Sequence, residues 1–144
     1  MRIIVQLMMV YLLSFVALQA SITDFQIIDQ AQQAYESKEY NKSSTLYKQL
    51  QKEVASRNYD LGNAYYKSGQ WDKALKAYKR AKGSEVDEQQ RLHNLGNTYF
   101  KQKKFDHAIK AYEAALKYRE DKDTRFNLEL AKKQKKKQQQ NKTK

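Results

Sequence analysis

Apolar residues recur with helical spacing in two similar segments, which begin at Asn58 and at Leu92. The first segment reads NYDLGNAYYKSGQWDKALKAYKRA and the second reads LHNLGNTYFKQKKFDHAIKAYEAA. Within each segment the apolar positions lie three or four residues apart, which is the spacing of an amphipathic helix. A polar break around Gly69, and again around Lys103, interrupts the pattern midway. Each segment therefore predicts two helices joined by a tight turn.

Small residues recur inside these predicted helices. Gly62 and Gly96 occupy the same place in the two first helices, and the second helices carry alanines at matching places: Ala74, Ala81, Ala108 and Ala115. A glycine inside a helix costs about 1 kcal/mol relative to alanine, so its recurrence needs a packing reason. We expect the paired helices to approach closely at these residues, with Tyr78 and Tyr112 filling the space beside them.

These positions carry a resemblance to a known repeat. Leu-Gly-x-x-Tyr at 61–65 and 95–99, followed by Ala-x-x-x-Tyr at 74–78 and 108–112, resembles the tetratricopeptide repeat (TPR). The resemblance implies an all-α fold, a right-handed TPR solenoid of antiparallel helix pairs with a C-terminal capping helix. The proline that the family usually has near the end of each repeat is missing. We expect Gly83 and helix caps at Ser84 and Asp123 to turn the chain instead.

Weaker copies flank the two clear repeats. YESKEYNKSSTLYKQL aligns with YKSGQWDKALKAYKRA, and RFNLELAKK matches the opening of one more first helix. We therefore predict a TPR domain over 21–131, with repeats at 24–53, 55–83 and 88–119 and a capping helix at 123–131 that solvates the last face. Residues 132–144 hold seven lysines and no acid. They predict a basic tail, solvated or a fraying helical extension, that packs on nothing.

Residues 1–20 have the layout of a secretory signal peptide. One arginine precedes an apolar run from Ile3 to Leu18, and Ala20 is the residue expected before the cut. This run is shorter than the roughly 20 apolar residues that a spanning helix needs. The alternative is an uncleaved membrane anchor. Because either outcome places the rest of the chain outside the cytoplasm, we expect an exported protein in the periplasm, free or associated with the inner membrane.

The composition excludes several kinds of catalytic and metal site. The chain has no cysteine, so disulfides, thiolate nucleophiles and cysteine-bound metals are excluded. Its two histidines, His93 and His107, have no partners at ligand spacing and no nucleophile beside them. We therefore predict a protein that is not an enzyme and carries no cofactor or metal. The formal net charge of +12 lies mostly in the tail, and export makes nucleic acid an unexpected partner.

The concave face of a TPR stack is lined by first helices, and such surfaces bind partners. Asn63 and Asn97 match the position at which peptide-binding TPR proteins hold a ligand's backbone amide. The preceding lysine position of the chaperone-binding members holds Tyr59 and His93, so their carboxylate clamp is not implied. The alternative is that the asparagines serve only the helix and the tyrosines only the core. The predicted partner-binding residues are Tyr59, Asn63, Tyr66, Lys67, His93, Asn97, Phe100 and Lys101, and Phe126 and Leu130 continue the same rows.

The layout of the whole chain also carries a resemblance. A signal segment, a short TPR stack and a NLELAKK ending before a Lys/Gln tail resemble the small TPR proteins of bacterial aerotolerance (Bat) operons. This implies a periplasmic scaffold that binds another protein or peptide, in particular membrane-anchored von Willebrand factor A domain proteins. The second hypothesis is a TPR assembly factor for another envelope complex. The third is a binder of anionic membrane surfaces, with weak contact through the Lys-rich tail.

Overall fold

The computed structural model describes residues 2–50 and 54–142, apart from the side chains at 2, 17, 18, 20, 21 and 142. Outside the described residues lie residue 1 of the predicted signal peptide, residues 51–53 of the first predicted repeat and residues 143–144 of the tail. The side chains on both sides of the predicted cut also lie outside them. The part of the chain that is described forms helices and no strand, which confirms the predicted all-α fold.

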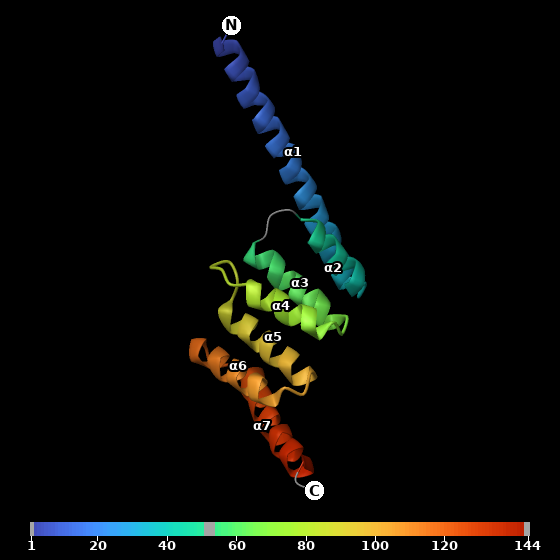
Figure 1. Ribbon diagram of the computed structural model, residues 1–144, viewed down its shortest axis with the longest axis vertical. Coiled ribbons are helices and arrows are strands. Elements are labelled where there is room, and N and C mark those ends of the chain that lie inside the picture. The colour runs from blue at the N-terminus through green and yellow to red at the C-terminus, as the bar shows by residue number, and fades with distance from the viewer. Residues whose placement is uncertain (1, 51–53, 143–144) are drawn as a thin grey trace. The chain divides into compact units, whose positions relative to one another are not determined.

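The elements follow one another as a run of helices with short connections (Figure 1). Their order is α1 (Arg2–Glu36), α2 (Tyr40–Gln49), α3 (Ala55–Lys67), α4 (Trp71–Arg80), α5 (Glu88–Lys101), α6 (Phe105–Tyr118) and α7 (Lys122–Lys142). The chain divides into two compact units, Met1–Gln51 and Lys52–Lys144. The first unit holds α1 and α2, and the second holds α3 to α7.

In the first unit, α2 folds back against the C-terminal part of α1. The N–H of Ser37 donates to the carbonyl oxygen of Gln33 at 2.9 Å, which closes the turn between the helices. Lys38, in the middle of that turn, has a φ of 63°. The rings of Tyr35 and Tyr40 meet edge to face across it, with 5.3 Å between their centroids.

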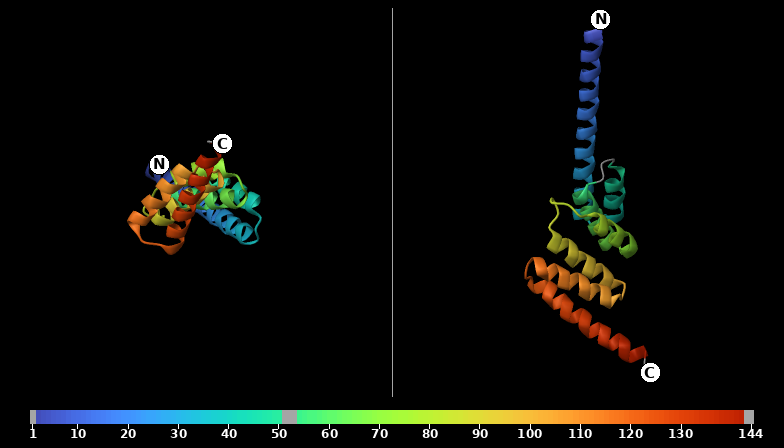
Figure 2. Two further views of the ribbon diagram at one scale, coloured as in Figure 1. Left: turned by 90° about the horizontal axis from the view of Figure 1, so that it is seen from below. Right: turned by 60° about the vertical axis from the view of Figure 1, so that its left-hand side comes forward.

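The N-terminal half of α1 extends past α2 (Figure 2). Its described apolar side chains are exposed. Ile3, Val10 and Val16, for example, are 71%, 65% and 64% exposed. Among the described residues, no helix combines the length and the apolar character needed to cross a membrane. The signal peptide over 1–20, and its alternative as a retained anchor, stay predictions.

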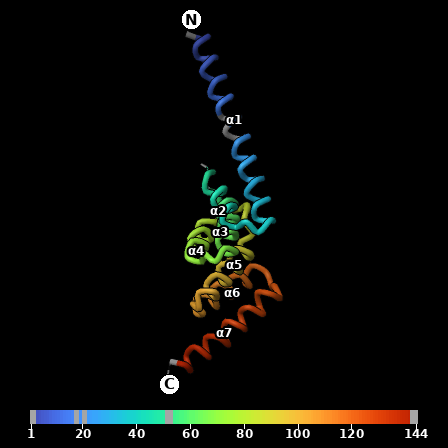
Figure 3. Tube along the Cα trace, turned by 90° about the vertical axis from the view of Figure 1, so that its right-hand side faces the viewer, coloured from blue at the N-terminus to red at the C-terminus, as the bar shows by residue number. Residues whose placement is uncertain are grey.

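In the second unit, α3 pairs with α4, α5 pairs with α6, and α7 follows against α6 (Figure 3). The two pairs turn in the same way. Gly69 has a φ of 75° and donates its N–H to the carbonyl of Tyr66 at 3.1 Å. Lys103 has a φ of 58° and donates to the carbonyl of Phe100 at 2.9 Å. The predicted pairs of helices with a tight turn are therefore confirmed, although lysine replaces glycine in the second turn.

The two helical glycines lie where the helices of a pair cross. A Cβ atom on Gly62 would lie 2.6 Å from Cδ1 of Tyr78, and one on Gly96 would overlap the ring of Tyr112. Both tyrosines are only 1% exposed, so neither ring has room to move aside. The alanines predicted to mark the crossings are all completely buried: Ala74, Ala81, Ala108 and Ala115. The packing reason expected for the recurring glycines is confirmed.

Helix α7 is longer than the capping helix predicted over 123–131, because it continues through Lys142. Leu128 and Ala131 are 2% and 0% exposed and pack against Ala108 and Tyr112 of α6. Beyond them, Nζ of Lys135 forms an ion pair with Oδ1 of Asp106 at 2.5 Å. The prediction that the tail packs on nothing is therefore wrong for its first residues, since a helical lysine reaches back to α6.

The helix caps differ from the predicted ones. The side chain of Asp87, not Ser84, caps α5 by accepting the N–H of Gln90 at 3.2 Å. Asp121, not Asp123, caps α7 by accepting the N–H of Thr124 at 2.7 Å. In both cases an aspartate three residues before the donor is correctly placed for a side-chain cap.

Candidate functional site

The first helices of the second unit border a pocket of about 240 Å³. It is lined by Tyr66 of α3, Asn97, Phe100 and Lys101 of α5, Tyr112 of α6, and Asn127 and Leu130 of α7. We call this the amide pocket, because two carboxamides, those of Asn97 and Asn127, lie on its wall. Four of the eight predicted partner-binding residues meet here: Tyr66, Asn97, Phe100 and Lys101.

The carboxamides of Asn63 and Asn97 form the same hydrogen bonds in successive repeats. Oδ1 of Asn63 accepts the hydroxyl of Tyr78 at 2.7 Å and Nδ2–H of Asn94 at 3.2 Å. Each of these three residues has a counterpart one repeat later. There, Oδ1 of Asn97 accepts the hydroxyl of Tyr112 at 2.7 Å and Nδ2–H of Asn127 at 3.0 Å. Each asparagine therefore joins its own second helix to the next first helix.

These bonds give the asparagines a structural role and leave part of each side chain available. Burial raises the pKa of the Tyr112 hydroxyl, which therefore stays protonated and donates to Asn97. The carboxamide oxygens of Asn63 and Asn97 are thus occupied within the fold. Their Nδ2–H groups have no acceptor among the described residues. The alternative of a structural role therefore holds for the two oxygens, whereas ligand contact through the two nitrogens stays a prediction.

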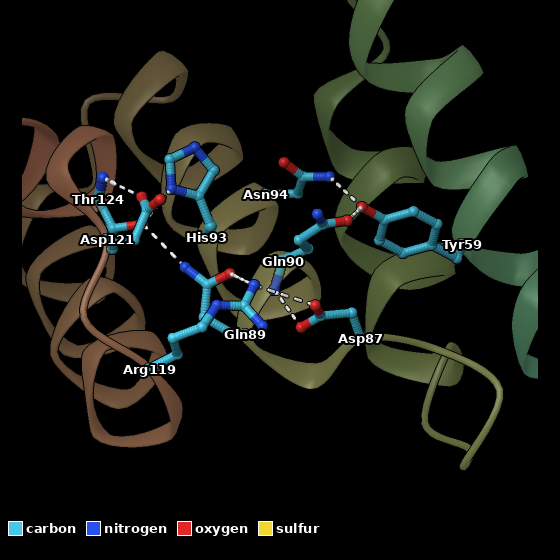
Figure 4. A network of polar contacts seen from close by, with 9 residues as sticks. All are labelled: Tyr59, Asp87, Gln89, Gln90, His93, Asn94, Arg119, Asp121 and Thr124. Atoms are coloured by element: carbon cyan, nitrogen blue, oxygen red, sulfur yellow. Dashed lines mark hydrogen bonds and ion pairs between the residues drawn. The ribbon is translucent and has the colours of Figure 1, made fainter.

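A second pocket, of about 270 Å³, lies near the N-terminal ends of α5 and α7 (Figure 4). It is lined by Tyr59, Gln89, Gln90, His93, Asn94, Arg119, Asp121 and Asp123. We call it the histidine pocket. Two of the predicted partner-binding residues, Tyr59 and His93, line it. The hydroxyl of Tyr59 accepts Nδ2–H of Asn94 at 3.0 Å.

His93 is held in one orientation by a short chain of hydrogen bonds. Its Nδ1 lies 2.7 Å from Oγ1 of Thr124, whose hydroxyl donates to Oδ1 of Asp121 at 2.6 Å. Because the single hydroxyl proton of Thr124 goes to the carboxylate, Nδ1 of His93 is the protonated nitrogen and Nε2 is an acceptor. Burial lowers the pKa of His93, while the charges of Asp121 and Asp123 partly oppose that shift. The ring is therefore neutral at pH 7 and offers one acceptor to a ligand.

Arg119 forms hydrogen bonds with two other residues near the histidine pocket (Figure 4). Its guanidinium donates to Oδ2 of Asp87 and to Oε1 of Gln89, both at 3.1 Å. Gln89 in turn donates to Oγ1 of Thr124 at 3.2 Å. The backbone N–H of Gln90, and then the Arg119 guanidinium, lower the pKa of Asp87, so this carboxylate stays ionised. These bonds connect the start of α5 to the segment that precedes α7.

Six of the eight predicted residues therefore line one of the two pockets. Asn63 lines neither of the two pockets but belongs to the same hydrogen-bond pattern as Asn97. Lys67 is exposed at the end of α3 and is not among the residues that line them. Within residues 2–50 and 54–142, no three His, Cys, Asp or Glu side chains gather so that they could hold a metal ion. What the two pockets offer is hydrogen bonding, aromatic contact and charge.

Sequence reasoning missed Asn94 and Asn127, although a signal for both was present. Each directly precedes the recurring leucine of a first helix, Leu95 or Leu128, and so occupies the same repeat position. Reading that position as well as the one after Leu-Gly would have found both. Arg119, Asp121 and Thr124 were also missed, and no repeat position marks them because they belong to the connection before α7 and to its first turn.

Comparisons with known proteins agree with this architecture. Family models of the tetratricopeptide repeat match residues 55–82 and 90–122. No curated protein sequence gives a significant match to the chain.

Solved structures show the same fold at low sequence identity. The TPR domain of Sgt2 from Aspergillus fumigatus is 22% identical with a TM-score of 0.69, covering 81% of this chain and 82% of that one. The first TPR of Spaghetti (RPAP3), bound to the HSP90 peptide SRMEEVD, is 14% identical with a TM-score of 0.70, covering 78% and 93%. The Yersinia enterocolitica type III secretion chaperone SycD, in complex with a peptide of the translocator YopD, is 17% identical with a TM-score of 0.67, covering 76% and 92%.

The repeat motifs, the glycine–tyrosine crossings and the fold comparisons lead to one result. Helix pairs α3–α4 and α5–α6 coincide with the residues that the two family matches cover. The predicted TPR solenoid is confirmed. Residues 55–82 and 90–122 therefore form tetratricopeptide repeats.

Proposed function

We propose that this chain is an exported, non-enzymatic TPR adaptor that holds an extended segment of another protein in the amide pocket. One observation carries the proposal. Nδ2 of Asn97 and Oδ1 of Asn127 have no partner among the described residues, and the two carboxamides are joined to each other. A free donor beside a free acceptor matches the carbonyl oxygen and the N–H of a peptide backbone.

The rest of the pocket defines the segment that fits. The rings of Tyr66 and Phe100, together with Leu130, offer an aromatic and apolar surface to one side chain. Lys101 is exposed, lines the same pocket, and attracts a carboxylate. The favoured ligand is therefore an extended segment that carries an apolar side chain next to an acidic group.

Structural neighbours support this class of ligand. Two TPR structures with the same fold, those of RPAP3 and SycD, hold peptides from other proteins. Their identity to this chain, 14% and 17%, relates the folds, so the particular partner of this chain has to come from its own pocket and from experiment.

The proposed place of action is the periplasm. The order of charged, apolar and small residues over 1–20 supports export, and the NLELAKK ending supports a role as an aerotolerance-operon adaptor for membrane-anchored von Willebrand factor A domain proteins. An assembly factor for another envelope complex would use the same pocket, and the identity of the bound partner decides between these two roles.

The test is site-specific photocrosslinking in cells that produce the full chain. A photoreactive residue at Phe100, inside the pocket, should capture a partner protein that mass spectrometry identifies. The same residue at Glu113, exposed on α6 and outside the pocket, is the matched control and should capture none. Equal capture at both positions, or none at Phe100, rejects the adaptor role. Recovery of the chain from the cytoplasmic fraction rejects export separately.

A further inference from the structure

Helix α7 exposes a face that a second helix covers in the preceding repeat. On α5 the corresponding face consists of Gly96, Tyr99 and Phe100. Gly96 lies against Tyr112 of α6, and the ring centroids of Tyr99 and His107 are 5.1 Å apart. Phe100 makes the third of these contacts, with 5.4 Å between its ring centroid and that of Phe105.

On α7 the same three positions are occupied by Glu129, Lys132 and Lys133. No helix covers them in the part of the chain that the structure describes. Instead they open onto a cleft of about 600 Å³ between α6 and α7, which we call the lysine cleft. Its lining residues are Ile109, Glu129, Lys132, Lys133, Lys135, Lys136 and Gln139.

The cleft has an apolar floor that is incompletely covered. Ile109 on α6 takes the position that Leu75 holds on α4. Leu75 is 7% exposed, whereas Ile109 remains partly exposed at the edge of the core formed by Tyr112 and Leu128. An apolar side chain from outside would remove further surface of Ile109 from water.

The charge of the cleft is unbalanced. Lys132 pairs with Glu129 at 2.9 Å and Lys135 pairs with Asp106 at 2.5 Å. Lys133 and Lys136, which also line the cleft, have no acidic partner among the described residues. Two unpaired ammonium groups beside an apolar floor favour a partner that brings both carboxylates and an apolar stripe.

We propose that the lysine cleft binds an acidic amphipathic helix of a partner protein, which takes the place that a second helix has in the other repeats. The repeat geometry supplies the shape, since a helix of the same kind already covers the matching face of α5. Ile109 receives the apolar stripe, and Lys133 and Lys136 receive carboxylates. This surface is separate from the amide pocket and does not depend on the proposed function.

The probe for the test is a synthetic peptide with capped ends and the same length as α6. One face carries leucine and alanine and the other carries glutamate, and a scrambled peptide of equal composition is the first control. Binding to the full chain is measured by fluorescence anisotropy. The patterned peptide should bind at least about tenfold more tightly than the scrambled one, because only it presents the stripe and the carboxylates together.

Matched variants locate the binding surface. The double variant Lys133→Glu/Lys136→Glu should weaken binding of the patterned peptide by about tenfold or more, and Ile109→Ser by several-fold. The control Lys122→Glu/Lys137→Glu makes the same change in net charge on the same helix but outside the cleft, and should change affinity less than about threefold. Circular dichroism and thermal unfolding verify that each variant folds.

Several results would overturn the proposal. Equal affinity for the patterned and scrambled peptides does so, as does an equal loss in both double variants, which would indicate diffuse charge attraction. Vesicles of phosphatidylcholine mixed with anionic phosphatidylglycerol form a further arm. Tight vesicle binding without peptide binding assigns the lysines to a lipid surface instead. Asn97→Asp, which alters the amide pocket, should leave peptide binding unchanged, so failure of one site is distinguishable from failure of the other.

Discussion

Gly96 lies against the ring of the buried Tyr112, and this contact leaves no space for a side chain at position 96. A methyl group at Gly96 would overlap the ring of Tyr112, which is 1% exposed and belongs to the same buried cluster as Leu128 of α7. Gly96→Ala should therefore lower the free energy of unfolding by about 1–3 kcal/mol, even though alanine is the better helix former. Thermal unfolding measures the loss. Glu113→Ala, at an exposed place on α6, should leave the midpoint nearly unchanged. An unchanged midpoint for Gly96→Ala would contradict the close crossing.

Asn97 combines a structural oxygen with a free nitrogen, and two substitutions separate these roles. Asn97→Ala leaves the buried hydroxyl of Tyr112 without its acceptor and should cost about 1–3 kcal/mol of stability. Asn97→Asp keeps an oxygen for Tyr112 and for Asn127, so it should cost less than Asn97→Ala. Urea unfolding of the two variants gives the comparison. If both lose the same stability, the bond from Tyr112 does not stabilise the crossing.

Asp60 occupies the position that Asn94 and Asn127 hold in the next two first helices. Burial raises the pKa of its carboxyl from 3.8 to about 6. Between these two pH values the folded chain holds a proton that the unfolded chain has released, so this group costs stability increasingly as the pH rises through that window. Asp60→Asn should therefore stabilise the fold at pH 7, and the gain should shrink as the pH falls toward 4. Urea unfolding at pH 7 and 4.5 tests this, and an equal gain at both would show that ionisation is not the cause.

At the scale of single residues, the sequence predicted those that repeat. Gly62, Gly96 and their tyrosine partners follow the period of the repeat, and the structure places them as expected. The caps at Asp87 and Asp121 were missed because each helix start offers two candidates, Ser84 and Asp87 for α5 and Asp121 and Asp123 for α7, and only the backbone path selects one of them.

At the scale of elements, the turns of the two pairs share one geometry but not one residue. Gly69 and Lys103 both have positive φ, which costs a lysine about 1 kcal/mol and a glycine almost nothing. Lys103→Gly should therefore raise the midpoint of thermal unfolding slightly, with a gain of about 1 kcal/mol or less because glycine also loosens the unfolded chain. Gly69→Ala is the reciprocal change and should lower the midpoint. A decrease for Lys103→Gly would mean that the lysine side chain stabilises the turn.

The C-terminal end of α7 could not be predicted from the sequence. A run of Lys and Gln has no apolar stripe to mark a packed helix, yet both residues are good helix formers. The ion pair of Lys135 with Asp106 is a contact between residues of different helices, and the one-dimensional pattern does not contain it. The same holds for Gln138, whose side chain donates to the carbonyl of Lys103 at 3.5 Å.

At the scale of the whole molecule, the fold was predictable because the same sequence pattern recurs in each repeat. The site was predictable only in part. Asn97, Phe100 and Lys101, which the resemblance assigned to a partner-binding face, line one pocket, and their role in binding stays a prediction. The resemblance did not show that Asn127 shares a hydrogen bond with Asn97, because that bond joins a clear repeat to the weaker copy that follows it. It also treated residues 132–144 as a tail, so the cleft between α6 and α7 could not be foreseen.

A partner protein could bind the second unit at the amide pocket or at the lysine cleft, and one experiment distinguishes the two sites. If the partner lies in the amide pocket, Asn97→Asp should weaken its binding several-fold, because the variant loses a neutral hydrogen-bond donor worth about 0.5–1.5 kcal/mol. Deletion of residues 132–144 should then matter less at physiological salt, where exposed charges are screened beyond about 8 Å. If the lysine cleft dominates, the deletion removes Lys133 and Lys136, binding falls more than with Asn97→Asp, and the remaining affinity loses its salt dependence. Affinities of the crosslinked partner for both variants, measured at two ionic strengths, distinguish these outcomes, and full binding by Asn97→Asp would reject the amide pocket as the docking site.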